Sequence, residues 1–264
     1  RYLVALGTED DDFDTDYGYS GKIQFAVAVR DPQVSETNDD GRGFESDNDG
    51  SSSYKNPRTS ATFSNVSLFG PYTDQSANQR HGHGLYLRRN TRLNIYNSVV
   101  SGFVKGQLII DGNTTQAAAA SDSLVIRNTI LGVDGIKPVV NVPSGQTWSR
   151  NDIILWFMDP VKENDTIENN SLGLNLPITL TSPNFIPQAN SPVHNASTWM
   201  VNSINLSAPS NVITTDGGTL QFSTNILPKY AIDSSLSWSI LSGSVVASIS
   251  QTGLLTASSN NAGN

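Results

Sequence analysis

Short apolar runs separated by polar breakers dominate this chain. Val, Ile, Leu, Thr and Phe recur in runs between Gly, Asn, Asp and Pro, and helical periodicity is nearly absent. Three runs share one phrase, in which apolar residues alternate up to an Asn, alternate again, and end at a Gly four or five positions later. These phrases are ATFSNVSLFG at 61–70, LNIYNSVVSG at 93–102 and LVIRNTILG at 124–132. The pattern predicts an all-β protein built from repeats.

The spacing of the repeated asparagines predicts how the strands are arranged. Asn65, Asn97 and Asn128 lie 32 and 31 residues apart, and the segments 85–90 and 107–112 fit between them as further strands. A repeat of this size cannot bury its apolar face alone, so successive repeats stack. We therefore predict a right-handed parallel β-helix, whose asparagines adopt left-handed backbone geometry and satisfy neighbouring backbone groups. An antiparallel sandwich is the alternative, although hairpin dipeptides such as Asn-Gly are rare here.

The pattern breaks after residue 143. Trp148, Trp156 and Phe157 interrupt the repeats, which predicts a short helix that caps or flanks the coil. Prolines then punctuate the segment 180–199, and proline cannot donate to a sheet, so we expect the first domain to close there. The domain should span residues 1–202.

The last part of the chain has a different pattern. From Ser203, strand-like runs alternate with an Asp-Gly-Gly turn and a second Gly turn around Trp238, which we expect to be buried. This order predicts a small antiparallel β-sandwich over residues 203–264, without an obvious last strand. Because Arg1 precedes a strand already in progress, we also expect the β-helix to be the C-terminal part of a longer one.

Composition and charge exclude several classes of function. Of 264 residues only 15% are charged, and the formal net charge is -8 with 16 scattered Lys and Arg. Nucleic-acid binding requires clustered basic residues and is therefore not expected. The chain has no Cys, which excludes disulfides and thiolate chemistry, and no apolar run of about 18 residues that would span a membrane.

Two acidic clusters are the candidate metal ligands. In the segment 9–16, four aspartates alternate with other residues, so an extended strand places four carboxylates on one face. The segment 45–50 repeats this alternation before a glycine. Calcium takes about six to eight oxygen ligands and would relieve the repulsion between the carboxylates, so a calcium site is predicted. The candidate ligands are Asp10, Asp12, Asp14, Asp16, Glu45, Asp47 and Asp49.

Other interpretations of these acids stay open. Neither cluster completes an EF-hand, and the acids could instead pair with arginines or cap turns. They could also be catalytic: polysaccharide lyases and glycoside hydrolases use parallel β-helices with carboxylates, basic residues and aromatic rings along one groove. The residues that could line such a groove are Asp12, Asp14, Tyr86, Arg88, Arg89, Tyr96 and Trp156. The pair His81 and His83 has no third metal ligand nearby in the sequence.

Two stretches resemble known families. The order DGGTLQFSTNILP, LSWSI and VASISQTGLLTA, across nearly all of residues 204–258, resembles the bacterial Ig-like domains of group 2. The phrases DDDFDTDYGYSGKIQFAVAVRDP, GFESDNDG, LYLRRNTRLNIYNSVVSGF, QLIIDG and SPNFIPQANSP resemble secreted parallel β-helix proteins of the Bacteroidota, commonly exported by type IX secretion. The resemblance implies an extracellular or cell-surface protein, and the sequons at Ser123 and Thr166 resemble O-glycosylation sites of that phylum.

These observations lead to one functional hypothesis and one alternative. We expect a non-enzymatic extracellular structural or adhesive protein, stabilised by calcium, that contacts a glycan or a surface protein and could self-assemble. The alternative is a polysaccharide lyase or glycoside hydrolase on the same scaffold. Burial of the acids against arginine or around an ion would favour the first, and exposure in one groove beside an aromatic ring would favour the second.

Overall fold

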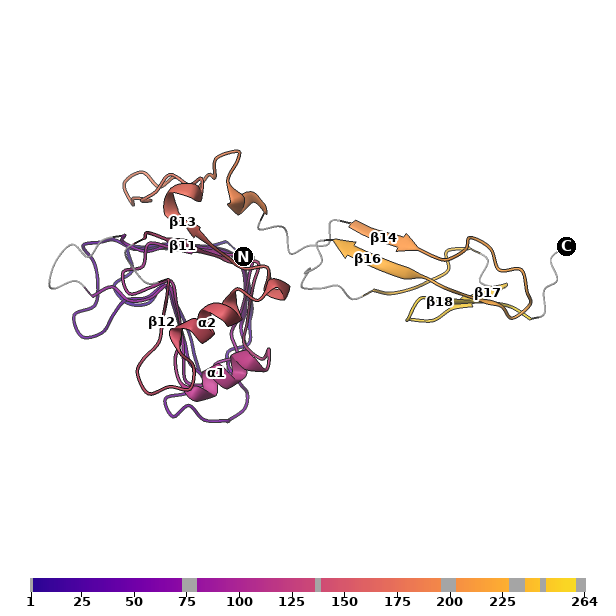
Figure 1. Cartoon of the computed structure of the whole chain (residues 1–264), viewed down its shortest axis with the longest axis horizontal. Helices are drawn as coiled ribbons and strands as arrows, with labels where there is room; N and C mark the ends of the chain where they lie inside the picture. The colour runs from indigo at the N-terminus through magenta and orange to yellow at the C-terminus, as the bar shows by residue number, and fades with distance from the viewer. Residues whose placement is uncertain are drawn as a thin grey trace. The chain divides into compact units, whose positions relative to one another are not determined.

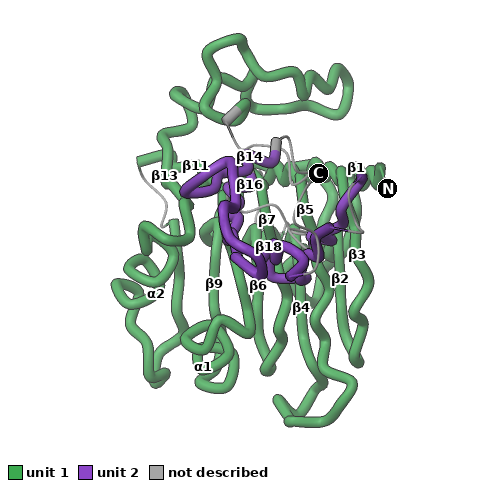
Figure 2. Tube along the Cα trace, turned by 90° about the vertical axis from the view of Figure 1, so that its right-hand side faces the viewer, with its two compact units in different colours: residues 1–197 green, residues 198–264 purple. Residues whose placement is uncertain are grey.

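The chain forms two compact units. The computed structural model describes residues 2–72, 80–135, 139–195, 203–227, 236–242 and 246–259, and it divides into residues 1–197 and 198–264, which Figure 2 colours separately. Each unit is built mainly from strands, as Figure 1 shows. They are described in turn as unit 1 and unit 2.

Unit 1 contains two parallel sheets. The long sheet has the order β1-β3-β5-β8-β11-β13, with β7 and β10 continuing it alongside β5. The short sheet has the order β12-β9-β6-β4-β2, and Figure 2 shows β9, β6, β4 and β2 side by side. The strands of the long sheet are β1 (Leu3–Leu6), β3 (Lys22–Val29), β5 (Thr62–Phe69), β7 (Asn94–Tyr96), β8 (Val99–Ser101), β10 (Val125–Arg127), β11 (Ile130–Val133) and β13 (Asp165–Glu168). Those of the short sheet are β2 (Phe13–Thr15), β4 (Phe44–Ser46), β6 (Leu85–Leu87), β9 (Leu108–Ile110) and β12 (Val140–Asn141).

Parallel pairing confirms the β-helix. Every strand pair among the described residues of unit 1 is parallel, so the antiparallel sandwich proposed as the alternative for this region is wrong. Like positions form columns from rung to rung: Phe13 pairs with Phe44, Phe44 with Leu85, and Leu85 with Leu108. Phe44 packs edge-on against Phe63 of the long sheet at 4.6 Å between ring centroids, so side chains of both sheets fill the interior.

The long sheet bends at one column of residues with positive φ, which we call the bend column. Its members occupy the same position on successive rungs, and the backbone N–H of one rung donates across the bend to the next, as from Asn97 to Arg127 O at 3.1 Å. The bend column consists of Tyr2 (φ 58°), Phe25 (φ 61°), Asn65 (φ 55°), Asn97 (φ 48°), Asn128 (φ 51°) and Glu163 (φ 53°). The left-handed geometry predicted for the three asparagines is confirmed.

The asparagine side chains satisfy the backbone less than we expected. The residue that follows a bend-column residue does so instead. Ser98 Oγ, after Asn97, accepts the N–H of Val66 at 3.2 Å, and Asn164 Oδ1, after Glu163, accepts the N–H of Thr129 at 3.0 Å. Since Asn adopts left-handed geometry more readily than most residues, conformation explains its recurrence in the bend column.

Two helices lie beside the short sheet of unit 1 (Figure 1). Helix α2 (Arg150–Phe157) begins with a capping box between Ser149 and Asp152 and buries Ile153 and Phe157 in the core, as the aromatic interruption predicted. Helix α1 (Asn113–Ala120) lies between β9 and β10 and was not predicted. The run of alanines that ends α1 is its strongest sequence signal, because Ala has the highest helix propensity.

A second apolar cluster lies outside the main core. Side chains of the long sheet, including Val29, Phe69 and Val99, pack against Leu172 and Ile178 of the irregular segment 172–193. Short 3-10 turns, η1 (Pro160–Lys162), η2 (Asn169–Ser171) and η3 (Pro192–Asn195), occur in this part of the chain. The proline-rich segment therefore packs by its apolar side chains rather than by strand pairing.

Unit 2 is a small sandwich of two antiparallel sheets, as predicted. One pairs β14 (Ser203–Ser207) with β16 (Ser223–Leu227), and the other has the order β15-β18-β17, with bounds Thr219–Gln221, Leu254–Ala257 and Ala247–Ile249. Trp238 packs against Phe222 and Gly253 but is only partly buried, so its predicted burial is wrong. The side chain of Gln251 brackets the Trp238 backbone with hydrogen bonds of 3.2 and 3.0 Å.

Candidate functional site: an arginine and carboxylate face on the short sheet

The outward side of the short sheet carries a column of different side chains. Asp14 pairs with Glu45, Glu45 with Tyr86, Tyr86 with Ile109, and Ile109 with Asn141. Successive side chains of a strand point to opposite faces, and the flanking residues fill the core, so this column faces away from it. Unlike the inward column from Phe13 to Leu108, which is apolar throughout, it combines acidic, aromatic, aliphatic and amide side chains.

Two arginines enclose Tyr86 and Glu45. The Cζ atoms of Arg42 and Arg88 lie 4.6 and 4.9 Å from the centroid of the Tyr86 ring. Arg42 Nη1 donates to Glu45 Oε2 at 2.7 Å, and Arg88 Nη2 donates to Glu45 Oε1. Both guanidiniums therefore stack on one ring and share one buried carboxylate.

The same arrangement continues into the next turn. Arg88 Nε donates to Asp47 Oδ1 at 2.8 Å, and Arg89 Nη1 donates to Asp47 Oδ2 at 2.7 Å. Arg89 and Asn90 both have positive φ (49° and 67°), and Asn90 is held in place because its Nδ2 donates to Ser53 O at 2.9 Å. A strained turn thus directs two adjacent arginines at one carboxylate. We call Arg42, Glu45, Asp47, Tyr86, Arg88 and Arg89 the ion-pair face.

Neighbouring polar groups extend the ion-pair face toward β9. Tyr86 Oη donates to Asp111 Oδ2 at 2.8 Å, and Gln146 Nε2 donates to Asp111 Oδ1. The His83 ring lies 5.7 Å from that of Tyr86, and burial lowers the pKa of His83 to about 4. His83 is consequently neutral near pH 7 and adds no charge.

The first acidic cluster wraps around an arginine that the sequence did not single out. Arg30 is 1% exposed, and its guanidinium donates to the carbonyls of Thr8, Glu9 and Asp10 at 3.2, 3.2 and 2.6 Å. It also contacts Asp12 Oδ1 at 3.3 Å. Arg30 directly follows the apolar strand β3, and its position after the run AVAV is the only signal for it.

Burial dominates the titration of Asp12. Its side chain is fully buried, and its Oδ2 has no hydrogen-bond partner within the described residues. Burial raises the pKa of Asp12 to about 6, against the lowering effects of Arg30 and Thr8. The single contact to Arg30 at 3.3 Å therefore compensates the carboxylate only in part.

The seven predicted metal ligands do not converge on one point. Asp12 contacts Arg30, Glu45 and Asp47 contact the arginines of the ion-pair face, and Asp49 caps the turn 49–53 through the N–H groups of Ser51 and Ser53. No group of three or more His, Asp or Glu side chains in the described part of the chain could hold a metal ion. Calcium binding by Asp10, Asp14 and Asp16, for which no ion pair is found among the described residues, stays a prediction.

The residues proposed to line an enzyme's groove do not all lie together. Tyr96 lies in β7 of the long sheet, Trp156 lies in α2, and the Asp12 side chain is buried. Asp14 is exposed on the short sheet, and partial desolvation of its carboxyl group, followed by the charges of Asp16 and Asp47, raises its pKa. Only Asp14, Tyr86, Arg88 and Arg89 thus share this part of the molecule.

The two candidate glycosylation sites lie in different settings. Ser123 follows α1, and its Oγ contacts that of Ser121 at 3.2 Å. Thr166 lies in β13, the last strand in the order of the long sheet, and pairs with Leu131. Both are partly exposed, and their modification stays a prediction.

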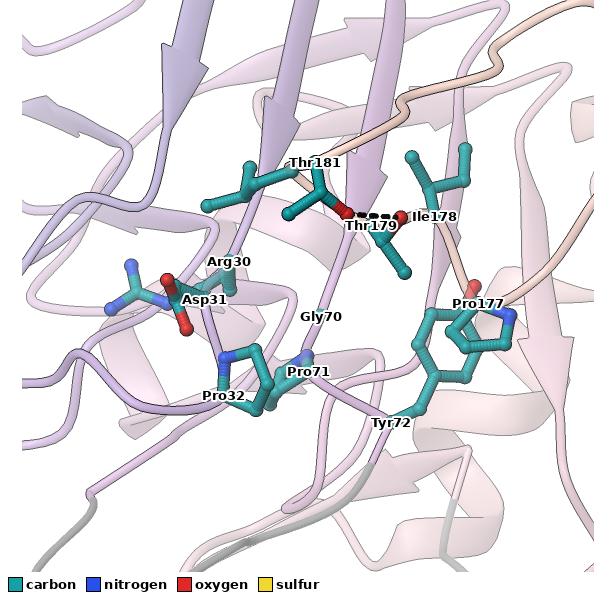
Figure 3. A pocket seen from close by; sticks show the side chains of 11 residues that line it. Arg30, Asp31, Pro32, Gly70, Pro71, Tyr72, Pro177, Ile178, Thr179 and Thr181 are labelled. Atoms are coloured by element: carbon teal, nitrogen blue, oxygen red, sulfur yellow. Dashed lines mark hydrogen bonds between the residues drawn. The ribbon is translucent and has the colours of Figure 1, made fainter.

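An apolar cavity of about 300 Å³ lies where the segment 177–181 crosses the ends of β3 and β5. Figure 3 shows the rings of Tyr72 and Pro177 on one side of it and Asp31 and Pro32 on the other. The Arg30 guanidinium is engaged by the turn 8–12, so this cavity offers few polar groups to a ligand.

Family comparisons agree with this architecture. The model of the family described as pectate-lyase like beta helix domain matches residues 1–166, and that of the bacterial Ig-like domain (group 2) matches residues 200–264. No match was found among curated proteins or among solved structures. In the described residues, no helix has the length and apolar character needed to cross a membrane.

Proposed function

This chain belongs to the pectate-lyase-like β-helix family, and although that fold can support enzymes, we propose that the chain is a non-enzymatic extracellular protein whose ion-pair face binds a glycan. β-Helix and group 2 Ig-like domains are typical of extracellular, carbohydrate-related proteins. Unit 2 would act as a spacer that presents unit 1. Export by type IX secretion in a member of the Bacteroidota belongs to the same proposal and rests on the quoted phrases alone.

One observation carries the proposal. Both carboxylates of the ion-pair face, Glu45 and Asp47, are held by guanidiniums, and two of these, from Arg42 and Arg88, also stack on Tyr86. A carboxylate whose two oxygens are both bonded to guanidiniums is poorly placed to attack a sugar carbon. It is well placed to orient planar hydrogen-bond donors toward sugar hydroxyls, because fixed donors lose little entropy on binding.

A glycan array tests this proposal. Wild-type protein should bind a defined set of the arrayed glycans. Arg89→Ala should weaken that binding, because Arg89 is the most exposed arginine of the ion-pair face, with 39% of its side chain exposed. The exposed Arg80→Ala, outside the ion-pair face, is the control. Wild-type protein that retains no glycan, or equal loss in both variants, contradicts the proposal.

Glycoside hydrolysis is the second candidate function. Asp14 is exposed, and its raised pKa beside Asp16 and Asp47 is a property of carboxyl pairs that share acid and base roles. Incubating each retained glycan with wild-type protein and Asp14→Asn, and measuring new reducing ends and unsaturated uronate absorbance, separates the two functions. If Asp14→Asn abolishes product formation, new reducing ends alone would replace binding by hydrolysis, and unsaturated uronates would replace it by a lyase reaction.

A further inference from the structure

We infer that two tyrosine-bearing turns beside the ion-pair face form a stacking platform for an uncharged polysaccharide, an inference that rests on the proposed glycan binding. In parallel strands the carboxyl ends meet at one edge of the sheet. The turns that follow β2, β4 and β6 therefore share an edge, and their backbones are joined by Asp47 N–H to Thr15 O at 2.9 Å and Asn48 N–H to Arg89 O at 3.1 Å. We call this the tyrosine edge.

The tyrosine edge exposes three rings. Tyr17 is 78% exposed, Tyr19 is 44% exposed, and Tyr54 is 67% exposed. Tyr17 and Tyr19 belong to the turn after β2, and Tyr54 belongs to the loop after β4. Aromatic rings stack on the apolar faces of sugar rings while neighbouring polar groups bond the hydroxyls.

Tyr17 has a conformation that stability does not explain. Its φ is 45°, a left-handed geometry that is rare for a bulky residue and costs about 1–2 kcal/mol. The mostly exposed ring recovers little of this by burial. A strained residue whose side chain is exposed points to a use outside the folded core.

Both turns are fixed by hydrogen bonds. Gly18 N–H donates to Thr59 Oγ1 at 3.0 Å, and Ser60 N–H donates to Tyr19 O at 2.9 Å, which joins the two turns. Asn48 Nδ2 donates to Ser53 O at 3.1 Å, and the guanidinium of Arg58 lies 5.1 Å from the Tyr54 ring centroid. Rings on fixed turns lose little freedom on binding, as in antibody paratopes rich in Tyr.

The surrounding charges favour an uncharged ligand. The segments 14–22, 45–58 and 88–92 contain five acidic residues and six basic ones, so they nearly balance. Several of these charges are already paired within the ion-pair face. A polyuronate would need a strongly basic surface, which these nearly balanced charges do not provide, and the whole chain carries -8.

Affinity electrophoresis of the whole chain tests the platform. The gels contain galactomannan, arabinoxylan or hydroxyethylcellulose as uncharged probes and polygalacturonate or alginate as acidic ones. At least one uncharged probe should retard wild-type protein, and Tyr54→Ala and Tyr17→Gly should each weaken that retardation about 3- to 10-fold, the value of one aromatic contact. Tyr17→Gly should leave the melting temperature unchanged or raise it, because Gly adopts φ near 45° without strain.

Tyr2→Gly is the matched control. Tyr2 is 73% exposed with φ 58°, so it shares the exposure and geometry of Tyr17, but it lies in the bend column of the long sheet. It should leave retardation unchanged. Retardation by acidic probes alone, or equal loss in Tyr2→Gly and Tyr17→Gly, overturns the platform while the proposed glycan binding stands. No retardation by any probe, together with an empty glycan array, overturns both.

Discussion

The bend column and the ion-pair face are both built by stacking, but they use it in opposite ways. In the bend column, one backbone conformation recurs on six rungs while the side chain changes from Tyr and Phe to Asn and Glu. In the ion-pair face, the rung of β4 contributes Arg42, Glu45 and Asp47, the rung of β6 contributes Tyr86, Arg88 and Arg89, and these groups contact one another across the two rungs. Conformation is thus the repeated requirement in the first region, and side-chain chemistry is the requirement in the second.

This difference predicts how each region tolerates substitution. A bend-column residue should be replaceable by any residue that accepts positive φ, above all Gly. Arg88 of the ion-pair face should not be replaceable even by lysine, because its planar guanidinium bonds two carboxylates and stacks on Tyr86 at once.

Arg30→Ala should cause the largest loss of stability. The substitution would leave the carbonyls of Thr8, Glu9 and Asp10 without their donor, leave the buried Asp12 carboxylate without its cation, and open a cavity. Together these effects should lower the free energy of unfolding by about 3–5 kcal/mol. Urea denaturation of the whole chain measures it. The exposed Arg80→Ala is the control, and a loss below about 1 kcal/mol for Arg30→Ala would show that the turn 8–12 folds without this anchor.

Asp12→Asn should stabilise the protein near pH 7. A carboxyl whose pKa rises from 3.8 unfolded to about 6 folded contributes stability below pH 4, and that contribution is lost as the pH rises to about 6. This lowers the free energy of unfolding of the wild type by about 3 kcal/mol, and Asp12→Asn avoids the loss because Asn cannot ionise. Melting temperatures of both proteins from pH 3.5 to about 8 should converge at the acid end. A wild type that is more stable than Asp12→Asn at pH 7 would mean that Arg30 compensates the carboxylate fully.

Arg88→Lys should be nearly as harmful as Arg88→Ala. Arg88 is the shared partner of Glu45 and Asp47 and one of the two cations on Tyr86, and a lysine cannot reproduce this geometry. Glu45 and Asp47 keep Arg42 and Arg89, so the loss should be about 1–3 kcal/mol. Urea midpoints of both variants measure the loss. Wild-type stability in Arg88→Lys would mean that position 88 requires only a positive charge and not the geometry of a guanidinium.

Much of the fold could be predicted because repetition leaves a record in the sequence. The spacing of Asn65, Asn97 and Asn128 indicated stacked rungs, and the interruption near Trp148 indicated a capping helix. The role of the asparagine side chains was misjudged, since Ser98 and Asn164 satisfy the backbone instead. A period reveals which position recurs but not which atom is bonded.

The candidate site could be predicted only in part. Alternating acids showed that Glu45 and Asp47 would lie near each other, and pairing with arginine was one of the interpretations left open. Arg30 could not be found, because its partners are carbonyl groups of the turn 8–12, which leave no trace in residue type. Contacts between rungs that do not repeat have no period to reveal them.

Asn97→Leu and Asn97→Gly provide the finest test of the contrast between the two regions. Leucine at φ 48° should cost about 1–2 kcal/mol through contact of its Cβ with the backbone, whereas glycine should be close to neutral, since it lacks the Cβ. The partly exposed Asn97 side chain makes no hydrogen bond within the described part of the chain, so little else is lost in either variant. Urea midpoints of the two variants and the wild type give the measurement. If Asn97→Gly loses as much stability as Asn97→Leu, the side chain itself is required, and the bend column would then resemble the ion-pair face in depending on chemistry rather than on conformation.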